Sequence, residues 1–85
     1  LEKYHAFDNT VEAAATCDYL GRLFVSMKGF AEGLKWYEKS LEIRSNLLPS
    51  NHPDFATSYT NIGRWYEQNG NYSRAAAFYK KALYI

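Results

Sequence analysis

Apolar side chains recur along this chain at steps of three and four residues, which is the spacing of a helix with one buried face. One stripe consists of Phe30, Leu34, Tyr37, Leu41 and Leu48, and a second of Tyr72, Ala76, Tyr79 and Leu83. No segment shows a competing strand pattern. The sequence therefore predicts an all-α chain in which each stripe marks the buried face of one helix.

A further helix precedes each stripe. We expect these helices to run from about residue 10 to 27 and from about residue 53 to 69. Each predicted start carries an Asn followed three residues later by an acidic residue, an arrangement that satisfies free N–H groups at a helix start. The two capping pairs are Asn9 with Glu12 and Asn51 with Asp54.

Tight turns should connect the helices within each unit. The candidates are Lys28-Gly29 and Asn69-Gly70-Asn71, because Gly and Asn tolerate the left-handed backbone that closes a helix. A polar loop between Pro49 and Pro53 separates the two units. Each unit is therefore predicted to be a helical hairpin.

The two units are copies of one pattern. Gly21 and Gly63 lie 42 residues apart, and the same offset places Arg22 on Arg64 and Tyr37 on Tyr79. A fixed period of this length is typical of a solenoid, in which each unit buries its apolar face against its neighbour.

Small residues should let the helices of a hairpin approach closely. Gly21 and Gly63 are expected to face Gly33 and Ala75, because closely packed helices need a position without a bulky side chain. The aromatic residues are expected to fill the hairpin cores: Phe24, Tyr37, Tyr66, Tyr72 and Tyr79.

Composition narrows the function. The 85 residues carry a net charge of +1, too little for a basic stripe that would bind nucleic acid or an anionic membrane. The single Cys17 and the lack of a signal-like or membrane-spanning segment predict a reducing, cytoplasmic location. The chain starts and stops at the same repeat phase, so we expect a piece of a longer array.

The second unit resembles the tetratricopeptide repeat. Its residues in the family's order and spacing are Tyr59, Ile62, Gly63, Tyr66, Gly70, Tyr72, Ala75, Tyr79, Ala82 and Leu83. The first unit matches more loosely, with Cys17, Lys28 and Ser40 in place of an aromatic, a glycine and an alanine. The 42-residue period is similar to the long-helix repeats of kinesin light chains.

This resemblance implies a right-handed α-solenoid of antiparallel helical hairpins in a single domain, residues 1–85. Within it, residues 1–8 would be the tail of a preceding helix, 9–50 the first repeat and 51–85 the second. It also implies a protein–protein interaction module, in which the first helix of each hairpin lines a concave groove that binds a peptide segment of a partner.

The resemblance further implies which residues face the groove. They are Ala15, Asp18, Tyr19, Arg22, Val25 and Ser26 in the first repeat, and Thr57, Thr60, Asn61, Arg64, Glu67 and Gln68 in the second. Arg22 and Arg64 share one repeat phase, and two guanidinium groups suit a carboxylate or phosphate. We therefore expect the groove to bind an acidic or aromatic-acidic peptide.

Alternatives to a ligand-binding groove stay open. Arg22 could instead pair with Asp18, and Arg64 with Glu67, as solvated ion pairs along one helix. Asn61 resembles a groove asparagine that holds peptide backbone, but the first repeat has Tyr19 there. The repeats could also be a structural spacer or a self-assembly segment that forms a homo-oligomer through its exposed ends.

The sequence favours neither catalysis nor a cofactor. His5 and His52 lie outside any zinc-binding spacing, Cys17 falls on the predicted core face, and no phosphate-binding loop or nucleophile motif is present. We therefore predict a non-enzymatic module without a metal site.

Overall fold

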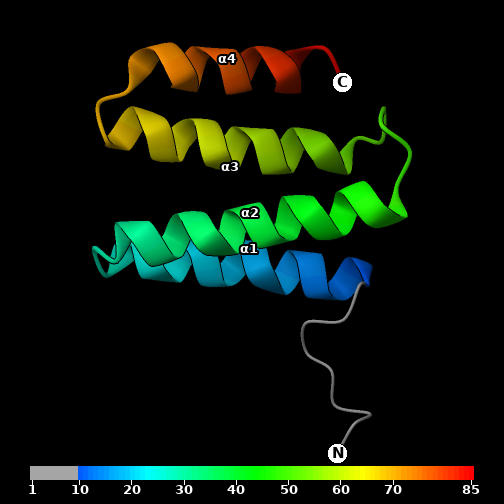
Figure 1. Cartoon of the computed structure of the whole chain (residues 1–85), viewed down its shortest axis with the longest axis horizontal. Helices are drawn as coiled ribbons and strands as arrows, with labels where there is room; N and C mark the ends of the chain where they lie inside the picture. Colours follow the sequence, from blue (N-terminus) through cyan, green and yellow to red (C-terminus); the bar gives the residue numbers. More distant parts are fainter. Residues whose placement is uncertain (1–9) are drawn as a thin grey trace, which may run out of the picture.

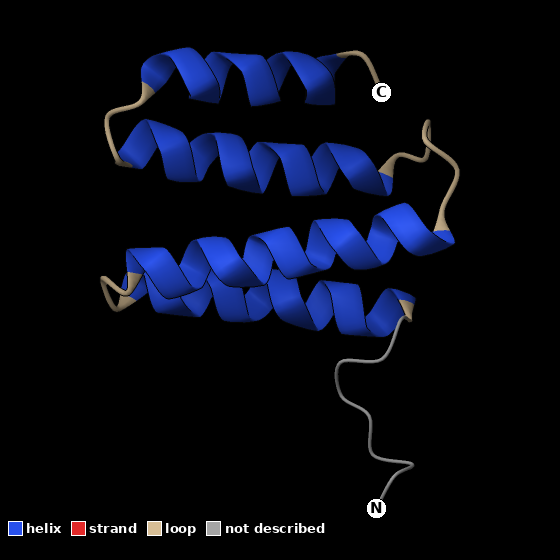
Figure 2. Cartoon of the chain, in the orientation of Figure 1, coloured by secondary structure: helices blue, strands red, loops and turns tan. Residues whose placement is uncertain are grey.

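A computed structural model describes residues 10–85 of the chain. These residues form four helices and no strand (Figure 2). The helices are α1 (Val11–Ser26), α2 (Phe30–Leu47), α3 (Asp54–Gln68) and α4 (Tyr72–Leu83). The predicted tail over residues 1–8 lies outside the described residues. The all-α prediction is confirmed for the part of the chain that the structure describes.

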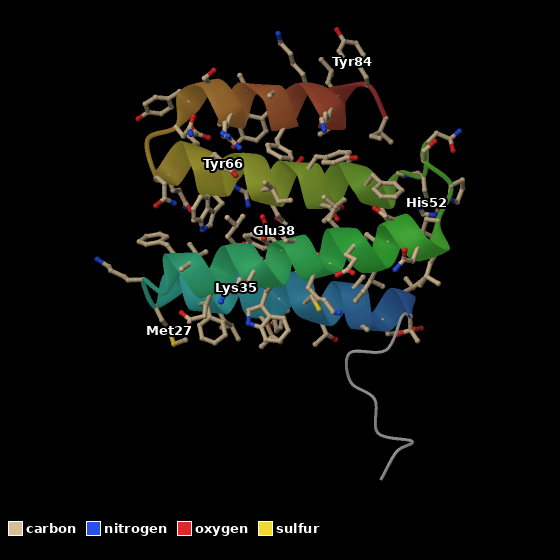
Figure 3. The ribbon with its side chains drawn as sticks, in the orientation of Figure 1. Met27, Lys35, Glu38, His52, Tyr66 and Tyr84 are labelled. Atoms are coloured by element: carbon tan, nitrogen blue, oxygen red, sulfur yellow. The ribbon has the colours of Figure 1, made fainter. Side chains whose placement is uncertain are left out.

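The helices lie in a row and alternate in direction (Figure 1). The closest packing joins α1 to α2 and α3 to α4, and a smaller interface joins α2 to α3. His52 lies in the linker between α2 and α3, whereas Tyr84 projects from the end of α4 (Figure 3). We refer to α1 with α2 as the first helix pair and to α3 with α4 as the second.

The first helix of each pair starts within one residue of its predicted position, but the residues that satisfy its first N–H groups differ from those predicted. At α1 the cap is Thr10, whose hydroxyl accepts from the N–H of Ala13 at 3.0 Å, and Asn9 lies outside the described residues. At α3 the prediction of an Asn51 cap is wrong, because the Nδ1 atom of His52 accepts from the N–H of Asp54. A neutral imidazole nitrogen can satisfy a free helix N–H as a hydroxyl does.

Both first helices end in the same hydrogen-bonded turn. In α1 the N–H of Gly29 donates to the carbonyl of Phe24, and in α3 the N–H of Asn71 donates to that of Tyr66. The left-handed residue of each turn is Lys28, with φ of 67°, and Gly70, with φ of 82°. The turn therefore falls where predicted, but in the first pair a lysine takes the conformation that favours glycine.

The close approach predicted at the glycines is confirmed. A Cβ atom built on Gly21 would lie 2.6 Å from the ring of Tyr37 and 3.1 Å from the carbonyl oxygen of Gly33. One on Gly63 would lie 2.9 Å from the ring of Tyr79 and 3.3 Å from the carbonyl oxygen of Ala75. Each tyrosine of the second helix thus occupies the space that a side chain on the first would fill.

The two pairs fill their cores with different side chains. In the first, Ala13, Ala14, Cys17 and Ile43 form a buried cluster against which Trp36 packs. In the second, the rings of Tyr66 and Phe78 stack with centroids 5.6 Å apart. Phe24, Tyr37, Tyr66 and Tyr79 are buried or half-buried as predicted, but the prediction is wrong for Tyr72, which is 69% exposed.

Candidate functional site

Three helices enclose a small hollow on one face of the molecule. Its volume is about 140 Å³, and α1, α2 and α3 all contribute to it. The lining residues are Arg22, Val25, Ser26, Tyr37, Arg64 and Gln68. None of these described lining residues is acidic, so the hollow presents guanidinium, hydroxyl and amide donors.

The repeat brings the two arginines of this hollow together. Arg22 lies on α1 and Arg64 on α3, and the 42-residue period gives these helices the same place in successive pairs. Both side chains are exposed. Two guanidinium groups beside one hollow can bind carboxylate or phosphate oxygens through paired, charge-assisted hydrogen bonds.

Tyr37 reaches the hollow from α2 because Gly21 leaves room for its ring. Burial raises the pKa of the Tyr37 phenol, whereas the charges of Arg64 and Arg22 act in the opposite direction. The phenol therefore stays protonated at neutral pH and can donate a hydrogen bond to an anion.

The corresponding tyrosine of the second pair is already engaged. The hydroxyl of Tyr79 donates to the Oε1 atom of Glu67 at 2.7 Å, and burial, with this hydrogen bond second, raises the pKa of the Tyr79 phenol. At the phase of Glu67 the first pair has Val25, which offers no acceptor. Val25 therefore cannot accept a hydrogen bond from Tyr37 as Glu67 does from Tyr79. Besides burial, the carboxylate of Asp18 raises the pKa of the Tyr37 phenol.

The structure places Asp18 and Asn61 differently from the expected groove positions. Each retains only 8% of its exposure. The Oδ2 atom of Asp18 lies 2.9 Å from Nη1 of Arg44, in an ion pair that joins α1 to α2. Asp18 is thus paired with Arg44 in place of Arg22, and Glu67 accepts from Tyr79.

The remaining expected groove residues do not line the hollow. Tyr19 is 65% exposed on α1, and Thr57 and Glu67 are exposed on α3, where Thr60 is half-buried. The residues expected to face the groove that converge on the hollow are therefore Arg22, Val25, Ser26, Arg64 and Gln68.

Two residues of this region were not among the predicted groove positions. The sequence predicts only a core position for Tyr37, yet its side chain is both buried and in contact with the hollow. Arg44 falls three residues after Leu41 and four before Leu48, within the apolar stripe of its helix. A charged residue that interrupts an apolar stripe is a signal for a buried partner.

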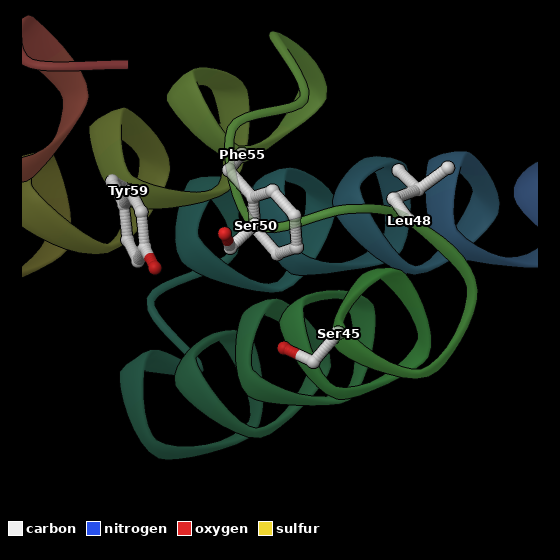
Figure 4. A pocket seen from close by; sticks show the side chains of 5 residues that line it. All are labelled: Ser45, Leu48, Ser50, Phe55 and Tyr59. Atoms are coloured by element: carbon white, nitrogen blue, oxygen red, sulfur yellow. The ribbon is translucent and has the colours of Figure 1, made fainter.

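A second hollow lies on the linker side of the molecule (Figure 4). The rings of Phe55 and Tyr59 from α3, Ser45 from α2, and Leu48 and Ser50 enclose about 310 Å³. These residues provide hydroxyl groups and apolar surface but no charge. The arginine-lined hollow is therefore the better candidate for charge-based recognition.

Comparison with known families agrees with this architecture. A family model described as tetratricopeptide repeat matches residues 11–85, which is almost the whole chain. The chain belongs to the tetratricopeptide repeat family. The searches of curated proteins and of solved structures gave no match. Tetratricopeptide repeats are non-enzymatic modules that generally mediate protein–protein interaction.

The described residues of the two tetratricopeptide repeats show no group of three or more His, Cys, Asp or Glu residues that could hold a metal ion. Burial, followed by the charge of Asp18, raises the pKa of the Cys17 thiol, so this sulfur is neutral at pH 7 and a poor nucleophile. Within residues 10–85 no helix is long and apolar enough to cross a membrane.

Proposed function

We propose that the chain is a protein–protein interaction module whose arginine-lined hollow binds an acidic or aromatic-acidic peptide segment of a partner protein. The observation that carries this proposal is the convergence of Arg22 and Arg64 on one hollow whose described lining residues include no acidic side chain. Tyr37 and Gln68 add uncharged donors beside them. Exposed Tyr19 offers a ring against which an aromatic residue of the peptide can pack.

We also propose a right-handed solenoid arrangement, as in long-helix repeats of the kinesin light chain type. The pairing of α1 with α2 and of α3 with α4, together with the 42-residue period, supports stacked helical hairpins, and the right-handed sense rests on the family resemblance.

A peptide-binding measurement tests the groove. Fluorescent peptides rich in Asp, Glu and aromatic residues are titrated with the chain and with the Arg22→Glu/Arg64→Glu variant, at low and physiological salt. Each charge-assisted hydrogen bond contributes about 1.5–3 kcal/mol. The variant should therefore bind at least about tenfold more weakly, and binding by the unmodified chain should weaken as salt rises.

A charge-matched control separates the site from the overall field. Lys35→Glu/Lys80→Glu changes the net charge by the same amount on exposed residues of α2 and α4 that do not line the hollow. This control should retain the affinity. Equal losses in the two variants, or unchanged binding by a folded Arg22→Glu/Arg64→Glu variant, would contradict the proposed groove.

The burial of residues at equal repeat phase favours a second candidate, head-to-tail self-association. On α2, Phe30 and Leu41 are half-buried, whereas Tyr72 and Leu83 at the same phases of α4 are 69% and 74% exposed. α2 packs against α3, where Trp65 is half-buried. Leu23, which has the same repeat phase on α1, is 49% exposed.

Among residues 10–85, the interface between α2 and α3 thus has two uncovered counterparts, the outer faces of α4 and α1. We propose that the outer face of α4 packs against α1 of a second copy in the manner in which α2 packs against α3. Such contacts are heterologous, so they add copies into an open row or a ring and do not form a symmetric dimer.

A further inference from the structure

Arg44 is a buried cation that contacts two helices at once. It is 6% exposed, and its Nη1 atom lies 2.9 Å from Oδ2 of Asp18 on α1. The same nitrogen donates to the Oγ atom of Ser58 on α3 at 2.7 Å. One guanidinium nitrogen carries two hydrogens, so a single group of α2 can serve both neighbours.

The helices that Arg44 joins are the ones that carry the two groove arginines. Arg22 lies on α1 and Arg64 on α3. The main interface of each of these helices with the rest of the tandem repeat involves α2 or α4, and α1 and α3 have little direct packing. Their separation therefore depends on how each is held against α2.

Asp18 also lies close to the hollow itself. It precedes Arg22 by four residues, so the two lie one turn apart on α1. A shift of α1 relative to α3 at Asp18 would therefore move Arg22 with it. The contact between Arg44 and Asp18 joins α2 to α1, and the contact with Ser58 joins α2 to α3.

The energetic contribution of the ion pair between Asp18 and Arg44 is a separate question from its effect on the positions of the helices. Burying an ion pair is often no more favourable than burying apolar residues of similar volume, because desolvation offsets the attraction. Among residues 10–85, the Oδ1 atom of Asp18 and the Nε atom of Arg44 have no hydrogen-bond partner, which adds to that penalty. The burial of the ion pair between Asp18 and Arg44 is therefore weak evidence for a stabilising role.

We propose that Arg44 is a positioning residue that fixes the separation of Arg22 and Arg64, so that the groove selects partner peptides by the spacing between two acidic side chains. This inference rests on the proposed peptide-binding function. It narrows the ligand class from acidic segments in general to segments with two carboxylates at one preferred separation.

The test uses a series of fluorescent peptides that contain two Glu residues separated by about one to six Ser or Ala residues, which varies the carboxylate separation by roughly 3.3 Å per residue. The readout is the ratio of the dissociation constant of the poorest spacing to that of the best spacing. The unmodified chain should show a ratio of at least about fivefold, since one misplaced charge-assisted contact weakens binding by that much or more.

Two variants remove the positioning contact while they keep the arginines of the groove. Ser58→Ala removes only the contact with α3, and Asp18→Leu/Arg44→Met replaces the ion pair with apolar side chains. In both variants the ratio should fall below about twofold while circular dichroism shows a folded chain. The double variant is expected to remain folded, because apolar replacement of a buried ion pair is often neutral or stabilising.

Ser40→Ala is the matched control. Its hydroxyl is also buried, on α2 one turn before Arg44, and its Oγ atom has no hydrogen-bond partner among the described residues. This variant should keep the spacing preference. If folded Ser58→Ala and Asp18→Leu/Arg44→Met keep it as well, Arg44 has no positioning role.

The remaining outcomes are also decisive. Binding by the unmodified chain without a spacing preference would overturn the role of Arg44 and leave the acidic-peptide groove standing. If the folded chain binds none of the series, whereas it binds longer acidic-aromatic peptides through Arg22 and Arg64, the two-carboxylate ligand class is wrong. If no acidic peptide binds, the proposed function itself is wrong and the inference fails with it.

Discussion

Lys28 occupies the left-handed position of its turn, and the equivalent residue of the second repeat is Gly70. The left-handed region costs an L-residue with a side chain about 1–2 kcal/mol, a penalty that glycine does not carry. At this position the first repeat therefore carries a backbone cost that the second repeat avoids.

Lys28→Gly should raise the free energy of unfolding by roughly 0.5–1 kcal/mol, since relief of the strained φ outweighs the added entropy of the unfolded chain. Urea denaturation measures the change. Lys28→Ala is the control, because it removes the charge but keeps the Cβ atom. An equal gain in both variants would show that charge, and not backbone conformation, is responsible.

At the residue scale, the buried thiol of Cys17 should make the stability of the folded chain depend on pH. Burial raises the pKa of this thiol above its usual value of 9.0, so the folded chain favours the neutral form. The associated stability is complete below about pH 9.0 and is lost as the pH rises through the higher pKa of the folded state. Burial raises the pKa of Tyr37 from 10.0, which adds a later loss of the same sign.

The free energy of unfolding should therefore fall with pH above about 9.0, with a slope of at most about 1.4 kcal/mol per pH unit for one group. In Cys17→Ala the decline should begin only near pH 10.0, where Tyr37 starts to contribute. Urea titrations across this range measure both onsets. Identical pH profiles for the two proteins would show that the thiol does not titrate differently on folding.

At the scale of the helices, packing within each pair depends on a glycine under a tyrosine ring. Alanine is favoured over glycine in a helix by about 1 kcal/mol, so without a clash Gly21→Ala would stabilise the chain. The 2.6 Å approach to Tyr37 reverses this expectation, because that ring is 5% exposed and has little room to move.

Gly21→Ala should destabilise the chain by about 1–3 kcal/mol, the usual range for overpacking a closely packed core. Gly63→Ala should cost less, because its Cβ atom would lie 2.9 Å from the half-buried ring of Tyr79. Thermal unfolding of both variants shows which substitution causes the larger loss of stability. A larger loss at Gly63, or a gain at Gly21, would contradict the packing described here.

At the scale of the whole molecule, the periodicity of the sequence predicts the helices, whereas side-chain burial and pairing depend on contacts between helices that the sequence pattern does not show. The three-and-four spacing predicts where the helices and turns lie. The 42-residue period predicts that Arg22 and Arg64 occupy equivalent positions in the two repeats. The burial of Asp18 was not predictable from its own helix, because it depends on Arg44 of another helix.

The exposure of Tyr72 was likewise not predictable from its own helix. The apolar stripe predicts a buried ring, yet within residues 10–85 no helix packs against the outer face of α4 and the ring is 69% exposed. Likewise, only the folded arrangement shows that Thr10 and His52 take the capping roles predicted for the neighbouring asparagines.

Head-to-tail assembly is tested by blocking one face at a time. Leu83→Glu places a charge on the outer face of α4, and Leu23→Glu places one on that of α1. Each variant alone retains one usable face, but two copies of the same variant cannot join. We expect light scattering to show that each variant is monomeric, that an equimolar mixture forms a dimer, and that the unmodified chain grows with concentration.

The mixed sample distinguishes this arrangement from a symmetric one. A symmetric contact through α4 alone would leave Leu23→Glu able to dimerise by itself. If the unmodified chain stays monomeric at all concentrations, or the mixture does not form the dimer, the second copy is not the occupant of these faces.

The junction between the repeats is fastened by polar contacts toward both ends of α2. The indole N–H of Trp65 donates to the carbonyl of Phe30 at 2.8 Å, and Arg44, in the last turn of α2, binds Ser58. Repeat arrays can melt unit by unit, because each unit contacts only its neighbours. Here neither repeat can separate without breaking both attachments, so the pair should denature as one cooperative unit, and the fluorescence of Trp36 and Trp65 should change together with helix loss.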